Sequence, residues 1–330
     1  MSTRVIIWKQ GPFYPELGKK IVELPINAKA GPSDDLIIIE GFSVEPDANG
    51  NFVEGVNREP YSEDDLDAIN TYAIIRIVIN LYNDLLGKAI KWSWWEKGNK
   101  DPLKVRIRNN DINARYLKEQ KCIELDFYGP FNKWTFYCRT VDIIAHEAGH
   151  AILDSLKPMW ENGDTEARGL VEAFCDLTAM FVILKQIDLC EYVIMETDGD
   201  FSKNSILTSF GVGHGFDERP NSEIRNALND KKYIRNHESA YHYSEVVVGL
   251  LYDLLCNLIT DNSCNEEIKS VNLRKCGQIW IAGVFNTFIS CDSEKPTLAE
   301  FGNNLLEIFE EYNDIIKQCL KVRKILSGTV

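Results

Sequence analysis

Two histidines lie four residues apart in the segment VDIIAHEAGHAILDSL, and a glutamate directly follows the first: His146, Glu147 and His150. Apolar residues flank them at helical spacing, so the segment predicts a helix on which positions i and i+4 share one face. Two imidazoles on one face can bind a single metal ion, and zinc is the metal that such a pair prefers. Glu147 lies where its carboxylate can reach a metal-bound water without binding the metal itself.

A catalytic zinc site needs a third protein ligand and an open position, and a second segment offers that ligand. Glu172 and Asp176 lie four residues apart in DTEARGLVEAFCDLTAMFV, whose apolar residues also recur at helical spacing. Such a pair alone is most often a solvated helix face. Beside the histidine motif, we expect Glu172 to complete a His2Glu site for one zinc ion, with Glu166 as the next candidate. Asp176 would accept the ring N–H of a zinc-bound histidine.

HEAGH followed by an E-x-x-x-D helix resembles the gluzincin zinc metallopeptidases, most closely the catalytic unit of the thermolysin family. The resemblance implies an α+β, two-lobed fold. A β-rich N-terminal lobe with the HEAGH helix would cover residues 1–157, and a helical C-terminal lobe would cover 158–330, as one catalytic unit. The predicted order agrees: short strands, a long helix over 62–86, further strands, the HEAGH helix, and then helices to the end of the chain.

The resemblance also implies residues that hold the substrate. Asn113 and Ala114 match the start of the family's edge strand, although Arg115 stands where the family has an aromatic residue. An edge strand has unpaired backbone groups, so an extended peptide can add to it; an ordinary strand end is the alternative. Arg225 would donate a hydrogen bond to the substrate carbonyl on the leaving-group side of the scissile bond, and a surface arginine is the alternative.

His242 precedes a predicted helix, where the family has a histidine that donates a hydrogen bond to the oxyanion formed when water attacks. Tyr241 and Tyr243 are alternative donors. The carboxylate that orients this histidine in the family is absent: His237 occupies its position, and whether the neighbouring Glu238 replaces it is open.

Calcium ligands are the clearest departure from the family. The apolar residues 182–184 and Lys185 occupy the region where the family's secreted members carry an acidic calcium-binding cluster. Asp142 is the one acid that still matches a calcium site. Calcium dependence is therefore doubtful, and the cofactor we expect is one catalytic zinc ion.

Composition limits the partners. The 330 residues are 45% hydrophobic and 11% aromatic, as in a globular protein. With 36 basic and 50 acidic residues the net charge is −14, which argues against nucleic acid or an anionic membrane. Nine cysteines without a C-x-x-C pair indicate a reducing compartment. No signal peptide or membrane span is evident, so we expect a monomer that is cytoplasmic or exported by a specialised route.

These features favour a zinc endopeptidase that hydrolyses peptide bonds by a metal-activated water, before apolar residues. Ile143 and Ile224, with Trp134 and Tyr137 near, are expected to line the pocket for the residue after the cut. One alternative is a catalytically impaired, zinc-retaining peptide-binding protein, which the missing partner of His242 favours. Another is an aminopeptidase of the wider gluzincin group, which would need acidic residues for the substrate α-amine; no Gly-x-Met-Glu-Asn segment precedes HEAGH.

Overall fold

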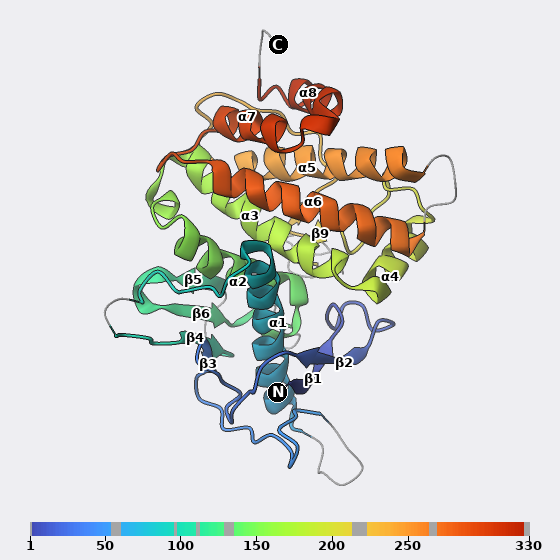
Figure 1. The fold of residues 1–330 in the computed structure, drawn as a ribbon. Helices are drawn as coiled ribbons and strands as arrows, with labels where there is room; N and C mark the ends of the chain where they lie inside the picture. The colour runs from blue at the N-terminus through green and yellow to red at the C-terminus, as the bar shows by residue number, and fades with distance from the viewer. Residues whose placement is uncertain are drawn as a thin grey trace. The chain divides into compact units, whose positions relative to one another are not determined.

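The structure is a computed structural model of mixed α+β architecture (Figure 1). It describes residues 2–53, 61–95, 98–109, 113–128, 135–212, 223–263 and 269–326. The chain divides into two compact units, Met1–Ser155 with Gly211–Ser222 and Leu156–Phe210 with Glu223–Val330. The predicted α+β class is confirmed: the larger sheet lies in the first unit, and most of the long helices lie in the second.

A four-stranded sheet organises the first unit. Its strands lie in the order β3 (Ile37–Ile39), β4 (Leu103–Ile107), β6 (Cys122–Leu125) and β5 (Ala114–Leu117). The first three are parallel, and β5 pairs antiparallel with β6 at the edge of the sheet. Two ribbons complete the unit: β1 (Thr3–Trp8) with β2 (Lys19–Leu24), and β7 (Phe127–Tyr128) with β8 (Thr135–Phe136). The apolar runs predicted as strands are therefore strands.

The long helix α1 (Glu63–Leu86) begins and ends where the sequence predicts. The Ser62 side chain caps it by accepting the Asp65 backbone N–H, and Gly87 ends it with a φ of 63°, a conformation that glycine adopts without strain. Buried side chains of α1 also hold the segment that leads into the next helix. Asn70 and Thr71 donate hydrogen bonds of 2.9 and 3.2 Å to the carbonyl of Cys138, in the short 3-10 helix η2 (Tyr137–Arg139).

The HEAGH segment lies in α2 (Val141–Leu156), which starts two residues after η2. The Val141 backbone N–H donates to the Gln10 carbonyl, so the N-terminal strand region holds the start of the helix. Thirteen of its sixteen residues are buried, among them both flanking apolar runs. A helix buried on nearly all sides has little freedom to shift, and this rigidity fixes the positions of the side chains that it carries.

The second unit is built on α3 (Thr165–Leu184), which carries the E-x-x-x-D segment and packs against α5 (Ala240–Ser263). Asp164 caps α3 by accepting the Ala167 backbone N–H. At Gly169 an added Cβ would lie 2.5 Å from the Cβ of Tyr243, so glycine permits the close approach of α3 and α5. A short ribbon of β9 (Ser209–Phe210) and β10 (Arg225–Asn226) belongs to the same unit.

The described part of the second unit has four more α-helices: α4 (Ile187–Thr197), α6 (Ser270–Ser290), α7 (Leu298–Ile308) and α8 (Asn313–Val322). The structure therefore has the helices that the sequence predicts between the HEAGH helix and the end of the chain. Helix α5 is long and apolar enough to cross a membrane, over Ala240–Asp261, yet 72% of its most apolar window is buried. It packs against α3, α6 and α8, so its apolar character is that of a core helix.

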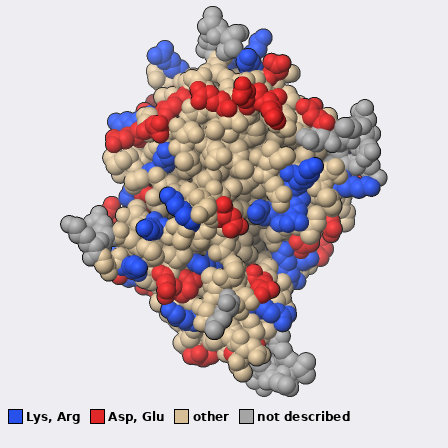
Figure 2. Space-filling model, in the orientation of Figure 1, with Lys and Arg blue, Asp and Glu red and all other residues tan. Residues whose placement is uncertain are grey.

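Charge is unevenly distributed on the face drawn in Figure 2. Acidic side chains form a band across the part of the second unit that α7 occupies in Figure 1.

No disulfide joins any two of the eight cysteines that the structure describes.

Candidate functional site

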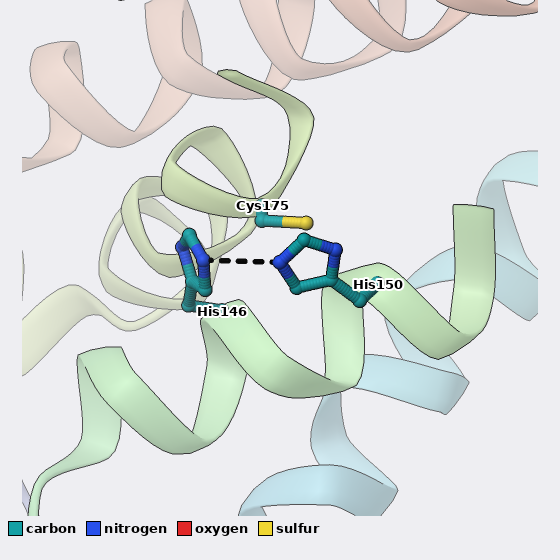
Figure 3. A group of neighbouring side chains, drawn as sticks. All are labelled: His146, His150 and Cys175. Carbon is teal, nitrogen blue, oxygen red and sulfur yellow. Dashed lines mark hydrogen bonds between the residues drawn. The ribbon is translucent and has the colours of Figure 1, made fainter. Parts of the chain in front are cut away.

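The two histidines of α2 face each other as the four-residue spacing predicts (Figure 3). Their Nε2 atoms lie 3.3 Å apart, with ring centroids at 5.0 Å and an interplanar angle of 73°. Two nitrogens bound to zinc at about 2.0–2.1 Å in tetrahedral geometry lie about 3.3–3.4 Å apart. The same distance permits a hydrogen bond if one nitrogen is protonated. The pair therefore already has the separation that a shared zinc ion requires.

Glu147 lies on the same helix, about 100° around its axis from His146. Its side chain is buried, with 6% of the residue exposed, and the neighbouring His150 is 8% exposed. The carboxylate thus borders the histidine face without lying on it. This is the arrangement expected of a general base beside a metal ion, as opposed to a ligand of the ion.

Carboxylates stand one turn before and one turn after the histidines, and other parts of the first unit hold both. Asp142 accepts the Gly211 backbone N–H at 2.7 Å, and burial raises the pKa of this carboxyl. Asp154 accepts hydrogen bonds from Ser93 Oγ at 2.7 Å and the Tyr116 hydroxyl at 3.0 Å. The histidine face is therefore fixed at both ends. Asp142, the acid that matches a calcium site, contacts a backbone amide here.

The strand β5 is at the edge of its sheet, as the sequence predicts, since β6 is its one partner in the described sheet. Asn113 precedes β5, and its carbonyl accepts the Asp126 backbone N–H at 3.0 Å. Arg115, which replaces an aromatic residue, donates from Nε and Nη2 to one oxygen of Glu124 on β6, at 3.0 and 2.8 Å. The departure from the family pattern thus forms a cross-strand ion pair. Whether Asn113 and Ala114 bind substrate stays a prediction.

The second unit brings together two residues to which the sequence analysis gives separate roles. Arg225, on β10, donates from Nε and Nη2 to the two oxygens of Asp176 on α3, at 2.8 and 2.7 Å. Their side chains are 15% and 2% exposed. Burial alone would lower the pKa of Arg225, but the Asp176 carboxylate outweighs it and raises the pKa. No local sequence signal marks this pair, because its members are 49 residues apart.

His242 lies in the first turn of α5, not before the helix as the sequence predicts. The helix starts earlier because Ser239 caps it, with Oγ accepting the His242 backbone N–H at 3.4 Å. The His242 Nε2 lies 2.9 Å from the Lys232 carbonyl, and its ring stacks on His237 at 4.0 Å. A carbonyl only accepts, so Nε2 carries the proton. Burial and the neighbouring His237 lower the pKa of His242.

The acids of α3 differ in what they contact. Glu166 accepts the Tyr233 hydroxyl at 2.9 Å on one oxygen and the Leu298 backbone N–H at 2.8 Å on the other. Both oxygens therefore tie the start of α3 to its surroundings, which disfavours Glu166 as a metal ligand. Glu172, six residues further along the helix, is half-buried.

Cys175 is a candidate metal ligand that the sequence analysis missed. Its side chain is drawn in Figure 3, and it is fully buried on α3, three residues after Glu172 and on the same side of that helix. Cys175 lies in an apolar run, a position typical of a small buried hydrophobic residue. Its spacing from Glu172 was the signal that could have marked it, since a cysteine thiolate is also a zinc ligand.

Residues expected to line the pocket for the leaving side differ in exposure. Ile143 and Tyr137 are buried within the first unit, at 8% and 7% exposed, whereas Ile224 in the second unit is 39% exposed. Trp134 lies outside the described residues. The predicted pocket lining stays a prediction.

Comparison with known proteins supports the fold. A solved structure, the precursor of protealysin, a metalloproteinase from Serratia proteamaculans, is similar to this chain with a TM-score of 0.52. The similarity covers 92% of this chain and 90% of that one, at 12% sequence identity. No family model matches the sequence, and no curated protein matches it. Identity this low shows a shared fold, and function has to be argued from the site.

Proposed function

We propose that this protein is a zinc-dependent endopeptidase of the gluzincin type. The observation that carries the proposal is the His146–His150 pair, whose Nε2 atoms lie 3.3 Å apart on a buried helix that also carries Glu147. The similar fold of a metalloproteinase precursor supports the same conclusion. The eight described cysteines, none joined to another by a disulfide, fit an enzyme that acts in a reducing compartment.

His146 and His150 would hold the zinc ion, with Glu172 of α3 as the proposed third ligand. Cys175 is the alternative, because it is a candidate ligand on the same side of α3. Bound zinc would supply the Lewis acid that polarises the attacking water and the substrate carbonyl. Glu147 accepts a proton from the water and passes it to the leaving amine.

The remaining roles belong to residues that hold the substrate. The outer edge of β5, beginning at Asn113 and Ala114, pairs with an extended peptide. Arg225 is held in a fixed orientation by Asp176 and contacts the peptide on the leaving side. His242 donates to the oxyanion after its Nε2 leaves the Lys232 carbonyl. We propose that the enzyme hydrolyses peptide bonds directly before apolar residues.

The third ligand is tested by metal content. Glu172→Ala should lower the zinc content of the purified protein sharply, whereas Cys175→Ala should leave it near that of the wild type, because only the first removes a ligand. The reverse result would assign the site to Cys175. Full zinc content in both variants would exclude both residues as ligands and point to another acid, with Glu166 the next candidate.

A zinc-retaining protein that binds peptides without cutting them is the second candidate, and the His242 contact favours it. With Nε2 bound to the Lys232 carbonyl at 2.9 Å, that ring nitrogen is already used. Zinc content and casein hydrolysis measured on one sample separate the two candidates. Zinc without hydrolysis supports the binding protein, and zinc with hydrolysis supports the peptidase.

A further inference from the structure

The tryptophan loop, residues 92–95, follows α1 in the first unit, and its tryptophans have no role in the site described above. Trp92 is buried, and its indole N–H donates to the Leu36 carbonyl at 2.9 Å. Trp94 stacks on it with ring centroids 5.4 Å apart and an interplanar angle of 11°. The Trp94 ring is half-buried. It is thus the outer member of a two-ring stack whose inner member belongs to the core.

The polar edges of the outer rings are already bonded. The indole N–H groups of Trp94 and Trp95 both donate to the Asp101 carbonyl, at 2.9 and 2.8 Å. The Asp101 carboxylate in turn lies 3.1 Å from Lys121 Nζ. Rings fixed in this way present apolar faces and have little conformational entropy left to lose when a ligand stacks on them.

One carboxylate oxygen connects this loop to the candidate site. Asp154 Oδ2 accepts from Ser93, the neighbour of Trp94, at 2.7 Å, and from the Tyr116 hydroxyl on β5 at 3.0 Å. Asp154 follows His150 by four residues, which is about 6 Å along the helix. The tryptophan loop, the edge strand and the metal-binding helix are therefore bonded to each other at a single point of the first unit.

We propose that Trp94 forms a substrate subsite that takes an aromatic or proline residue upstream of the scissile bond. This proposal rests on the proposed peptidase function. A peptide antiparallel to β5 has its N-terminal part at the Leu117 end, and Tyr116 at that end contacts Asp154. An extended chain advances about 3.3 Å per residue, so the residue on Trp94 lies about two to four positions before the cut. A flat side chain extends the indole stack, and alanine cannot.

Equilibrium binding tests the subsite without relying on turnover. The full-length chain with Glu147→Gln, loaded with zinc, is titrated with fluorescein-labelled peptides that share one leucine after the cut. They carry phenylalanine or alanine at the second, third or fourth position before it. At one of these positions phenylalanine should bind about tenfold more tightly than alanine, which is the contribution of one aromatic stack.

Substitution assigns the preference to its residue. Trp94→Ala should abolish the preference, so that the phenylalanine and alanine peptides bind with affinities within about twofold of each other. Trp94→Leu, which keeps apolar burial without a flat face, should do the same and covers the case in which the alanine variant does not fold. Trp8→Ala is the matched control, since Trp8 is a half-buried tryptophan on β1 of the same unit, with Lys19 against its ring; it should keep the preference.

The outcomes separate the subsite from the function on which it rests. Equal binding of all peptides, or a phenylalanine preference that survives both Trp94 variants, would overturn the subsite and leave the peptidase standing. Failure of every peptide to bind the zinc-loaded protein would overturn the proposed function and the subsite together.

Discussion

The helices α2 and α3 carry polar residues at the same four-residue spacing, yet the two helices use the spacing differently. On α2 the two residues contact each other: His146 and His150 approach to 3.3 Å within one helix. On α3 the corresponding acid Asp176 is bound by Arg225, from a strand 49 residues further along the chain. Spacing along a helix fixes which side chains can meet, but the rest of the fold decides which ones do.

The difference divides the candidate site into two kinds of group. The geometry of the histidine pair is a property of one buried helix and changes little unless that helix unfolds. The arrangement of Asp176, Arg225 and His242 depends on the packing of α3, β10 and α5. Substitutions on α2 should therefore affect chemistry and leave stability largely intact, whereas substitutions around α3 should affect stability first.

The largest effect should come from Glu147→Gln. The amide is close in shape to the carboxylate but cannot take a proton from water, so peptide hydrolysis should fall by about 10²–10⁴-fold or more. Zinc content and thermal stability should stay near those of the wild type. Initial rates on casein measure the loss of hydrolysis. The control is Glu119→Gln, a substitution of an exposed glutamate in the same unit, which should leave the rate unchanged. An active, stable Glu147→Gln protein would show that Glu147 is not the base.

Asp176→Asn should produce the largest loss of stability. It leaves the buried Arg225 guanidinium without its counter-charge, and breaking a buried ion pair costs about 3–5 kcal/mol. Urea unfolding followed by circular dichroism measures the free energy of unfolding. Asp35→Asn, which breaks the exposed pair with Lys29 in the other unit, should change stability little. Equal effects of the two substitutions would contradict the distinction between the two helices.

Gly169→Ala should have a smaller effect on the same unit. The added methyl would lie 2.5 Å from the Tyr243 Cβ and force α3 and α5 apart, and overpacking of this kind costs about 1–3 kcal/mol. Gly277→Ala on α6 is the milder comparison, because its methyl would meet Leu184 Cβ and Cδ2 at 3.2 Å, a tight contact rather than an overlap. Denaturation midpoints of the two variants give the comparison. A more stable Gly169→Ala protein would mean that the two helices are not packed this closely.

The smallest effect concerns pH. Burial, His237 and Lys231 lower the pKa of His242 in the folded protein. The Lys232 carbonyl and Glu245 raise it, but the net direction is down. Its pKa is higher in the unfolded chain, at about 6.5, so the unfolded state binds the proton first. The contribution of His242 to the free energy of unfolding is fully present above pH about 6.5 and is lost as the pH falls below that value. His242→Gln should flatten the fall in melting temperature between pH 7 and 5; an unchanged slope would exclude His242 as its cause.

The features that the sequence predicts are those that local signals determine. Ser62, Gly87 and the apolar runs mark the ends of α1 and the strands, and the spacing of His146 and His150 places both rings on one face. Tertiary contacts determined the rest. Nothing local to Asp176 or Arg225 indicates that they pair, and the Lys232 carbonyl that contacts His242 carries no sequence signal.

Zinc content measured together with hydrolysis tests the central claim most directly. The full-length chain is purified under reducing conditions, and its metal content and casein hydrolysis are measured beside those of a variant with His146→Ala and His150→Ala. The account predicts about one zinc per wild-type chain, hydrolysis that a chelator abolishes and zinc restores, and neither zinc nor hydrolysis in the variant. A double variant that keeps its zinc, or wild-type hydrolysis that persists after the metal is removed, would contradict the account.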